Sequence, residues 1–323
     1  MGTMISLNSN ETEIFVEEFI IHPGYPKTGT TFYQDIIFNN LDHINYIGKT
    51  SVQDNEFIDN INILRDYLCN NLSENLDIEN KLINFFKKRV NKKKIHLLSS
   101  EFFFDVEHNK LGNDFKKFVS IESVCKRIFK FFSKFSRNVK IIISIREPNE
   151  LLHRYYLNRY EHYKKFNIYD FESFKKFQFK SEESFASSLK FEKLYKLFKE
   201  NFNKDIFFIK FELLSKKSEF EIKKISKIFG VNDAKIIKLI TENKEQNKSL
   251  KINNKYYATY NTYPNWIYKI KKKFVNFRFF FLLKIIFNFF FSFLKKKDLI
   301  RNEDDDNPFF KETKLFYIEN KFN

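Results

Sequence analysis

One short polar segment near the N-terminus has the composition of an anion-binding loop. Gly24–Thr31 reads Gly-Tyr-Pro-Lys-Thr-Gly-Thr-Thr, with two glycines that let backbone N–H groups approach a ligand, one lysine, and two threonine hydroxyls at its end. It follows the apolar run Ile14–Ile21 and leads into Thr30–Asn39, which has helical character. Because a helix N-terminus favours negative charge, a strand, this loop and a helix in that order predict a phosphate or sulfate site.

The position of the lysine separates two kinds of nucleotide loop. The spacing of Gly24 and Gly29 fits the nucleoside triphosphate loop GxxxxGK[ST], but Thr30 stands where that loop requires lysine, and Lys27 lies inside the loop instead. The segment resembles the YPK[ST]GTTW loop of the sulfotransferase family at every position but the last. The resemblance implies that the loop binds the 5′-phosphosulfate of 3′-phosphoadenosine-5′-phosphosulfate (PAPS), with Lys27 in catalysis and the ring of Phe32, which replaces tryptophan, as a face for adenine. The implied cofactor-binding residues of the loop are Gly24, Tyr25, Pro26, Lys27, Thr28, Gly29, Thr30, Thr31 and Phe32.

A second segment supplies a cation suited to a phosphate group. The apolar strand candidate Val139–Ile145 ends in Arg146-Glu147-Pro148, and a planar guanidinium can bind a phosphate through two parallel hydrogen bonds. This resembles the family's second signature, an Arg-x-Pro followed by a helical serine eight residues after the arginine. The resemblance implies that Arg146 binds the 3′-phosphate of PAPS, and Arg154 stands at the serine position as a second cation. The alternatives are a surface arginine after an edge strand, and a basic helix residue without a specific role.

Three shorter segments resemble motifs of proteins related to bacterial carbohydrate sulfotransferases. Leu97–Glu101 resembles a strand that ends in Ser-Ser-Glu, and Ile206–Leu213 resembles a later strand that ends in an acidic residue, here Glu212. Asn247-Lys248-Ser249 is similar to a short motif near the nucleotide, which adds Lys248 and Ser249 to the implied cofactor-binding residues. The resemblance covers roughly residues 19–250.

Sulfuryl transfer needs a group that takes the proton of the attacking acceptor. Glu101 follows the apolar strand candidate Ile95–Ser99, and the carboxyl ends of parallel strands line the ligand crevice of an open sheet. We therefore expect Glu101 to be the catalytic base. His96 and His43 are the next candidates, and a helix-capping or surface role for Glu101 stays open. The two cysteines have no metal-ligand spacing, so we expect neither a metal site nor a disulfide.

Short apolar runs alternate with helical patterns along most of the chain. This alternation predicts an α/β fold with a parallel β-sheet flanked by helices, and the resemblance implies the P-loop-like sulfotransferase fold. The expected strands are Ile14–Ile21, Ile44–Ile47, Ile95–Ser99, Val139–Ile145 and Asp205–Phe211. The expected helices are Thr30–Asn39, Glu56–Asn70, Ile78–Val90, Phe115–Phe135, Asn149–Tyr163, Glu183–Asn201 and Glu219–Phe229.

The composition changes near Pro264, so we expect a sulfotransferase domain over residues 1–263 and a C-terminal helical extension over residues 264–323. Between the triplets Lys271–Lys273 and Lys295–Lys297 lies the apolar stretch Phe274–Leu294, interrupted by Arg278 and Lys284. These charges favour an amphipathic helix on an anionic membrane surface over a membrane span. A C-terminal helix packed in the core is the competing interpretation.

The formal net charge of +16 is compatible with a phosphorylated cofactor, with acidic lipid headgroups or with nucleic acid. The 44 phenylalanines exceed what base stacking needs, so nucleic acid is the partner we do not expect. The favoured function is sulfuryl transfer from PAPS to a saccharide or glycolipid, with 3′-phosphoadenosine-5′-phosphate (PAP) as product and no metal. The alternatives are a P-loop kinase or nucleotide hydrolase, and a non-catalytic basic module that binds nucleic acid or membranes. The N-terminus lacks signal-peptide features, which predicts a cytoplasmic protein, in part at the inner membrane surface.

Overall fold

The protein is described here by a computed structural model that covers residues 16–48, 55–69, 75–91, 93, 95–104, 120–180, 184–202, 206–242, 251–252, 255–261 and 295–302. These residues fall into two compact units. The first consists of the described residues up to Pro148 together with those between Glu182 and Gln246. The second consists of Asn149–Ser181 and the described residues after Asn247.

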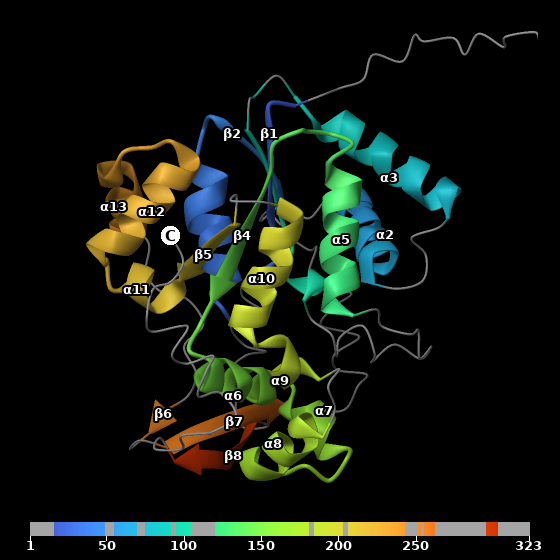
Figure 1. The fold of residues 1–323 in the computed structure, drawn as a ribbon. Helices are drawn as coiled ribbons and strands as arrows, with labels where there is room; N and C mark the ends of the chain where they lie inside the picture. Colours follow the sequence, from blue (N-terminus) through green and yellow to red (C-terminus); the bar gives the residue numbers. More distant parts are fainter. Residues whose placement is uncertain are drawn as a thin grey trace, which may run out of the picture. The chain divides into compact units, whose positions relative to one another are not determined.

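The centre of the first unit is a five-stranded sheet in which every neighbouring pair is parallel. Its order is β2-β3-β1-β4-β5, as Figure 1 shows. The predicted α/β class and parallel sheet are therefore confirmed. The strand that precedes the loop runs to His22, one residue further than the apolar pattern indicated. The strands are β1 (Glu18–His22), β2 (Ile44–Gly48), β3 (Ile95–Ser99), β4 (Val139–Ile145) and β5 (Ile206–Lys210).

Neighbouring residues of β1 pack into different hydrophobic layers. Phe19 contacts the ring of Phe86 on α3 (Leu76–Arg89) and the ring of Phe132 on α5 (Ile121–Phe132). Ile20 belongs to the cluster that α12 (Glu219–Phe229) and α13 (Asp233–Glu242) complete. Figure 1 shows these two helix groups on either side of the strands. Because both faces are covered, the strands read as continuous apolar runs rather than as alternating ones.

Several predicted helices of the first unit are confirmed in position but divided. The segment predicted as one helix over Thr30–Asn39 is a short α-helix, a π-helix and a 3₁₀ helix in succession. The segment Glu183–Asn201 contains two helices, separated at Leu189 and Lys190. The helix over Glu219–Phe229 has the predicted bounds. The remaining elements of this unit are α1 (Thr30–Phe32), η1 (Tyr33–Ile37), η2 (Phe38–Asn40), α2 (Asn55–Cys69), η3 (Glu101–Phe103), α9 (Phe185–Ser188), α10 (Phe191–Phe202) and α11 (Phe211–Ser215).

The second unit joins helices to a small antiparallel sheet. The helix predicted over Asn149–Tyr163 is interrupted at Arg159, which divides it into two. The rings of Tyr156 and Phe174 stack at 4.7 Å in its core. Its elements are α6 (Pro148–Asn158), α7 (Tyr160–Lys164), α8 (Phe171–Phe179), β6 (Lys251–Ile252), β7 (Lys255–Asn261) and β8 (Lys295–Asn302), with the strand order β6-β7-β8.

The C-terminal expectations are only partly covered by the structure. Lys295–Lys297, the basic triplet after the apolar stretch, forms the start of strand β8. The expected amphipathic helix over Phe274–Leu294 lies outside the described residues, as do Lys248 and Ser249. Within the described part of the chain, no helix has both the length and the apolar character that crossing a bilayer requires.

Candidate functional site

The loop between β1 and α1 has an unusual backbone at the two positions that matter most. Lys27 has a φ of +70° and Gly29 a φ of +82°, so two left-handed residues lie two positions apart. The backbone N–H of Tyr33 then bonds to the Gly29 carbonyl at 3.1 Å, which starts the following helical segment. The side chains of Lys27 and Thr31 are exposed, whereas the side chain of Thr28 is buried. The loop therefore presents a cation and a hydroxyl on its outer side.

Neither glycine of the loop has room for a Cβ atom. A Cβ at Gly29 would lie 2.2 Å from Cδ2 of Phe211, the first residue of α11. A Cβ at Gly24 would lie 2.6 Å from Cγ2 of Thr30 and 3.1 Å from Oγ of Ser144. Real Cβ atoms essentially never come closer than 3.0 Å to another atom, so the compact shape of the loop requires glycine at both positions.

Two aromatic side chains of the loop region point into the protein. Tyr25 is fully buried, and its hydroxyl donates a hydrogen bond to the Ser188 carbonyl. Burial raises the pKa of that hydroxyl. The ring of Phe32, 9% exposed, packs edge-on against Phe211 at 5.6 Å. Both residues therefore anchor the loop to the core, and the contact of Phe32 with adenine stays a prediction.

The structure brings Arg146 from the end of β4 to the same loop. Its Nη1 donates to the Lys27 carbonyl at 2.9 Å, and its Nε donates to Oε1 of Glu212. Its guanidinium carbon also lies 5.0 Å from the ring centroid of Phe211. Arg146 is only 7% exposed, so it is not the surface residue of the alternative interpretation. Its position stabilises the carbonyl of a residue in a strained backbone conformation.

Glu101 also contacts the loop, on the side where β3 ends. The hydroxyl of Thr30 donates to Oε2 of Glu101 at 2.6 Å. Glu101 opens η3, and the preceding Ser100 bonds through its N–H to the His22 carbonyl at 3.0 Å. This bond continues the pairing of β3 with β1 and holds the segment before Glu101 beside the loop.

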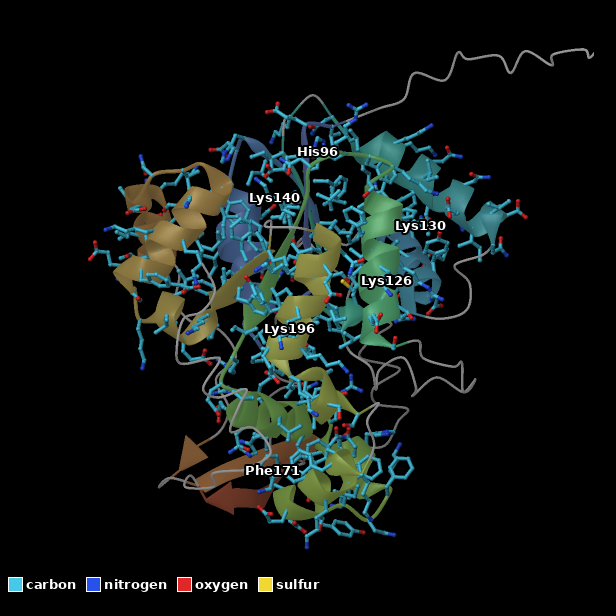
Figure 2. The ribbon with its side chains drawn as sticks, viewed as in Figure 1. His96, Lys126, Lys130, Lys140, Phe171 and Lys196 are labelled. Carbon is cyan, nitrogen blue, oxygen red and sulfur yellow. The ribbon has the colours of Figure 1, made fainter. Side chains whose placement is uncertain are left out.

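The two alternative bases lie at the opposite end of the sheet, where the strands begin. His43 precedes the amino end of β2, and its Nε2 lies 2.7 Å from the carbonyl oxygen of Phe229. His96, labelled in Figure 2, is the second residue of β3, and its Nε2 accepts a bond from the Asn91 N–H at 3.2 Å. Burial lowers the pKa of His96 to about 4. Neither histidine is at the carboxyl edge, where the loop and Glu101 lie.

A buried group of polar side chains beneath the loop was not predicted from the sequence. His22, Ser99 and Ser144 are polar residues near the carboxyl ends of three adjacent strands, β1, β3 and β4. The imidazole Nδ1 lies 2.7 Å from the Ser99 hydroxyl, and Nε2 lies 3.1 Å from the Ser144 hydroxyl. The available signal was one polar residue at or next to the carboxyl end of each of these three strands, after a run of at least two apolar residues.

The end of β5 is held in place by a buried carboxylate. Glu221 on α12 is fully buried and accepts a bond from the Lys210 N–H at 2.7 Å. Lys224 lies 3.4 Å from the other oxygen of this carboxylate and donates to the Phe208 carbonyl at 3.1 Å. Burial raises the pKa of Glu221. These contacts fix the strand end from which Glu212 reaches Arg146.

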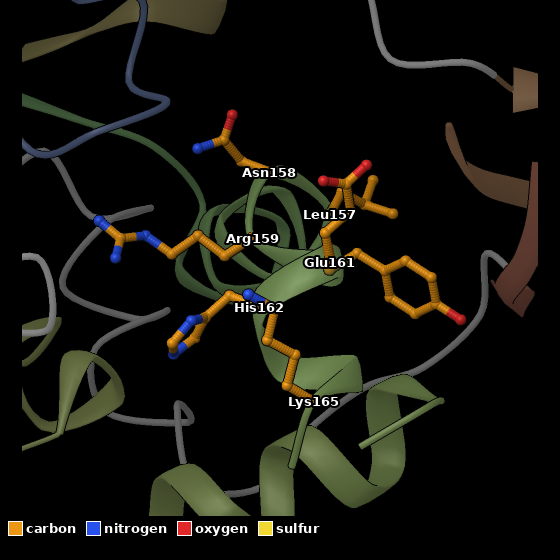
Figure 3. A pocket seen from close by; sticks show the side chains of 7 residues that line it. Leu157, Asn158, Arg159, Glu161, His162 and Lys165 are labelled. Atoms are coloured by element: carbon orange, nitrogen blue, oxygen red, sulfur yellow. The ribbon is translucent and has the colours of Figure 1, made fainter. Parts of the chain in front are cut away.

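The second unit contains Arg154 and a pocket. Arg154 lies on α6 and pairs with Glu150 one turn earlier, at 2.6 Å. A pocket of about 450 Å³ opens where α6 meets α7, and Figure 3 shows its lining side chains. Burial lowers the pKa of His162 in this lining. The lining residues are Leu157, Asn158, Arg159, Tyr160, Glu161, His162 and Lys165.

Residues 18–274 match the family described as "Sulfotransferase domain". The chain belongs to the sulfotransferase family. The sulfotransferase from Alicyclobacillus acidocaldarius, a solved structure, is similar over 68% of this chain and 82% of that one, with 10% identity and a TM-score of 0.39. No curated protein matches the sequence.

Membership of this family makes the protein a transferase that moves sulfuryl groups. It confirms the family resemblance of the loop, and it favours the transferase prediction over a kinase or nucleotide hydrolase. Both specific sequence signatures, the loop Gly24–Thr31 and the Arg146–Pro148 segment, fall inside the matched residues. In this sulfotransferase Lys27, Arg146 and Glu101 all lie beyond the carboxyl ends of the parallel strands.

Comparing the variants Gly29→Ala and Gly230→Ala separates the effect of backbone strain on stability from the effect of steric contact. Both glycines are left-handed, with φ of +82° and +64°, so alanine costs about 1 kcal/mol at either position. Only at Gly29 would the new Cβ also meet a ring, that of Phe211, since nothing lies within 4 Å of a Cβ at Gly230. We expect urea denaturation to give a loss of about 1 kcal/mol in unfolding free energy for Gly230→Ala, and of at least about 2 kcal/mol for Gly29→Ala. Equal losses would contradict the close packing of Phe211 on the loop.

Proposed function

We propose that this sulfotransferase moves a sulfuryl group from PAPS to a hydroxyl or amine of a saccharide or glycolipid. The observation that supports this most is the convergence of three groups on one loop. Arg146 holds the Lys27 carbonyl, Glu101 accepts from the Thr30 hydroxyl, and the Lys27 side chain is exposed beside them. A donor-binding cation, an anion loop and a carboxylate are the parts that sulfuryl transfer from a nucleotide requires.

The loop has the properties that a phosphosulfate ligand demands. Gly24 and Gly29 let the loop fold tightly, because a Cβ at either position would collide with Thr30 or Phe211. The exposed Thr31 supplies a hydroxyl, and Lys27 supplies positive charge. When bound, PAPS supplies a sulfuryl group that is already activated by its bond to a phosphate.

Lys27 is the residue we assign to charge stabilisation. Transfer leaves negative charge on the phosphate side of the broken bond, and a cation fixed near that oxygen lowers the barrier. The left-handed backbone of Lys27 is held by Arg146 through its carbonyl, while its side chain is exposed. The protein therefore fixes the backbone from which this cation extends.

Glu101 is the residue we assign to proton transfer. Its carboxylate accepts a bond from the Thr30 hydroxyl, which fixes its orientation at the edge of the loop. An oriented carboxylate there can accept the proton that an attacking hydroxyl or amine releases. We prefer it to His96 and His43 because both histidines lie at the amino edge of the sheet.

Arg146 is the residue we assign to the 3′-phosphate, and its contacts give it a second task. Two of its N–H groups already bind the Lys27 carbonyl and Glu212. A guanidinium has further donors, which leaves capacity for a phosphate oxygen. Arg146 therefore combines support of the loop with recognition of the group that distinguishes PAPS from ordinary adenine nucleotides.

The membrane assignment depends on charge and on the C-terminal sequence. The apolar stretch Phe274–Leu294 follows Lys271–Lys273 directly, a pattern suited to an anionic bilayer surface. The first unit adds exposed lysines, among them Lys130 on α5 and Lys196 on α10 (Figure 2). A glycolipid acceptor at the inner membrane surface would be within reach of a protein bound there.

Ligand preference tests the donor assignment. The protein should bind PAP more tightly than ATP with magnesium in calorimetric titrations, whereas a kinase would show the reverse. A charge-assisted hydrogen bond is worth about 1.5–3 kcal/mol, so Arg146→Ala should reduce the preference for PAP over adenosine 5′-phosphosulfate roughly ten- to hundredfold.

The ratio of the two affinities matters here because loss of Arg146 also removes a support of the loop. Thr28→Val is the matched control, since it disturbs the loop without touching the guanidinium and should weaken both ligands equally. If Arg146→Ala also weakens both ligands equally, the arginine is structural only.

Two further variants separate chemistry from binding. Glu101→Gln keeps an acceptor for the Thr30 hydroxyl but cannot take a proton, so turnover should fall at least about 10²-fold while PAP affinity is retained. Lys27→Ala should lower turnover more than it weakens PAP binding. Both are measured by single-turnover sulfuryl transfer and PAP titration. Near-normal turnover of Glu101→Gln, together with an inactive His96→Ala or His43→Ala, would move the base to a histidine.

Vesicle binding tests the membrane assignment. The full chain should sediment with vesicles that contain phosphatidylserine, and binding should weaken as salt is added, because the attraction is electrostatic in part. Replacement of Lys271, Lys272 and Lys273 by glutamine should weaken it, and truncation before Lys271 should abolish it. A truncated chain that aggregates instead would show that the C-terminal segment belongs to the core.

A further inference from the structure

Five buried side chains form a continuous series of hydrogen bonds, here called the relay. It runs from the helical segment after the loop, through the sheet, to the loop itself. Each is less than 9% exposed: Gln34 on η1, Ser99 on β3, His22 on β1, Ser144 on β4 and Thr28 in the loop. The heavy-atom distances along this chain are 3.0, 2.7, 3.1 and 2.7 Å. The chain ends at the Tyr25 carbonyl, which accepts a bond from the Thr28 hydroxyl at 2.7 Å.

The direction of every bond follows from counting protons. A hydroxyl has one proton, and Thr28 gives its proton to the Tyr25 carbonyl, which can only accept. The 2.7 Å contact between Thr28 and Ser144 therefore requires Ser144 to donate. The proton of Ser144 is then used, so the 3.1 Å contact with Nε2 of His22 requires that nitrogen to carry a proton.

The other side of the imidazole completes the assignment. Burial lowers the pKa of His22 to about 3, so the ring is neutral and carries only one proton. Because that proton is on Nε2, Nδ1 must accept from the Ser99 hydroxyl at 2.7 Å. The Ser99 oxygen in turn accepts from the amide of Gln34 at 3.0 Å. Every bond therefore points toward the loop.

The imidazole and the loop are also in close steric contact. A Cβ at Gly24 would lie 3.2 Å from Cε1 of His22 and 3.1 Å from Oγ of Ser144. The same Ser144 side chain thus touches the first glycine of the loop and bonds to Thr28 in its middle. A shift of the ring would be transmitted to both parts of the loop.

We propose that His22, as the neutral tautomer protonated at Nε2, is a positioning residue that holds the anion loop in its binding conformation through Ser144 and Thr28. The Tyr25 carbonyl carries partial negative charge, which would repel an anion if it turned outward. The relay fixes this carbonyl to a buried hydroxyl and so keeps it from the ligand side. The role in PAP binding rests on the proposed function, whereas the tautomer and the direction of the relay do not.

Two substitutions of His22 distinguish the roles of its two ring nitrogens. Glutamine can place an amide N–H near the position of Nε2, whereas asparagine reaches only the position of Nδ1. We expect His22→Gln to retain PAP affinity and turnover within a few-fold, because it can still donate to Ser144. His22→Asn should lose at least about tenfold in PAP affinity, because the Ser144 hydroxyl loses its donor. His96→Asn is the matched control, a buried histidine of the same sheet at its other edge, and it should leave PAP binding unchanged.

The wild-type chain offers a readout that does not depend on any variant folding or on PAP binding. Nitrogen-15 NMR of labelled histidine should show the His22 ring with a proton on Nε2 and a lone pair on Nδ1. A ring protonated at Nδ1, or at both nitrogens at neutral pH, would overturn the relay. Equal PAP affinities of folded His22→Gln and His22→Asn would overturn the positioning role. If the wild-type chain binds no PAP while the tautomer is as expected, the donor assignment fails and the relay stands.

Discussion

The anion loop can serve a ligand only if the protein satisfies its inward-facing polar groups. A buried carbonyl or hydroxyl without a partner costs about 1–3 kcal/mol, and a carbonyl that turned outward would repel an anion. Here the Tyr25 carbonyl is bound by Thr28 and the Lys27 carbonyl by Arg146. The sheet order places β1 between β3 and β4, so polar residues at the ends of both neighbours can reach beneath the loop. The arrangement of the rest of the site depends on this support.

The sequence was sufficient to predict the parts that local pattern determines. Five apolar runs became the five strands, and because they are parallel their carboxyl ends meet at one edge, which is why Glu101 and Arg146 could be expected beside the loop. The left-handed conformation of Gly29 also agrees with its residue type. These features require only periodicity, residue type and the rule that strand ends line the crevice.

Other features depend on tertiary packing and could not be predicted from periodicity. The helix expected over Thr30–Asn39 changes from α to π to 3₁₀ geometry, and the same apolar pattern would fit any of the three. The contact of Arg146 with Glu212 depends on where β5 ends, and the buried Glu221 on α12 binds the last residue of that strand. In the second unit the helix expected over Asn149–Tyr163 is present in two pieces, whereas α8 mixes aromatic and basic residues and was not among the expected helices.

The strain at Lys27 shows why support and chemistry are combined in this loop. A lysine at φ +70° is less stable than a glycine there by about 1 kcal/mol, so glycine would be the favoured residue if shape alone mattered. Lysine adds an exposed ammonium group, and the bond from Arg146 to its carbonyl offsets the strain. That bond and the Thr28 bond exist in the protein alone, so both carbonyls are already oriented without a ligand. Groups that are oriented in advance stabilise developing charge more than mobile groups do, because no free energy is lost in ordering them during the reaction.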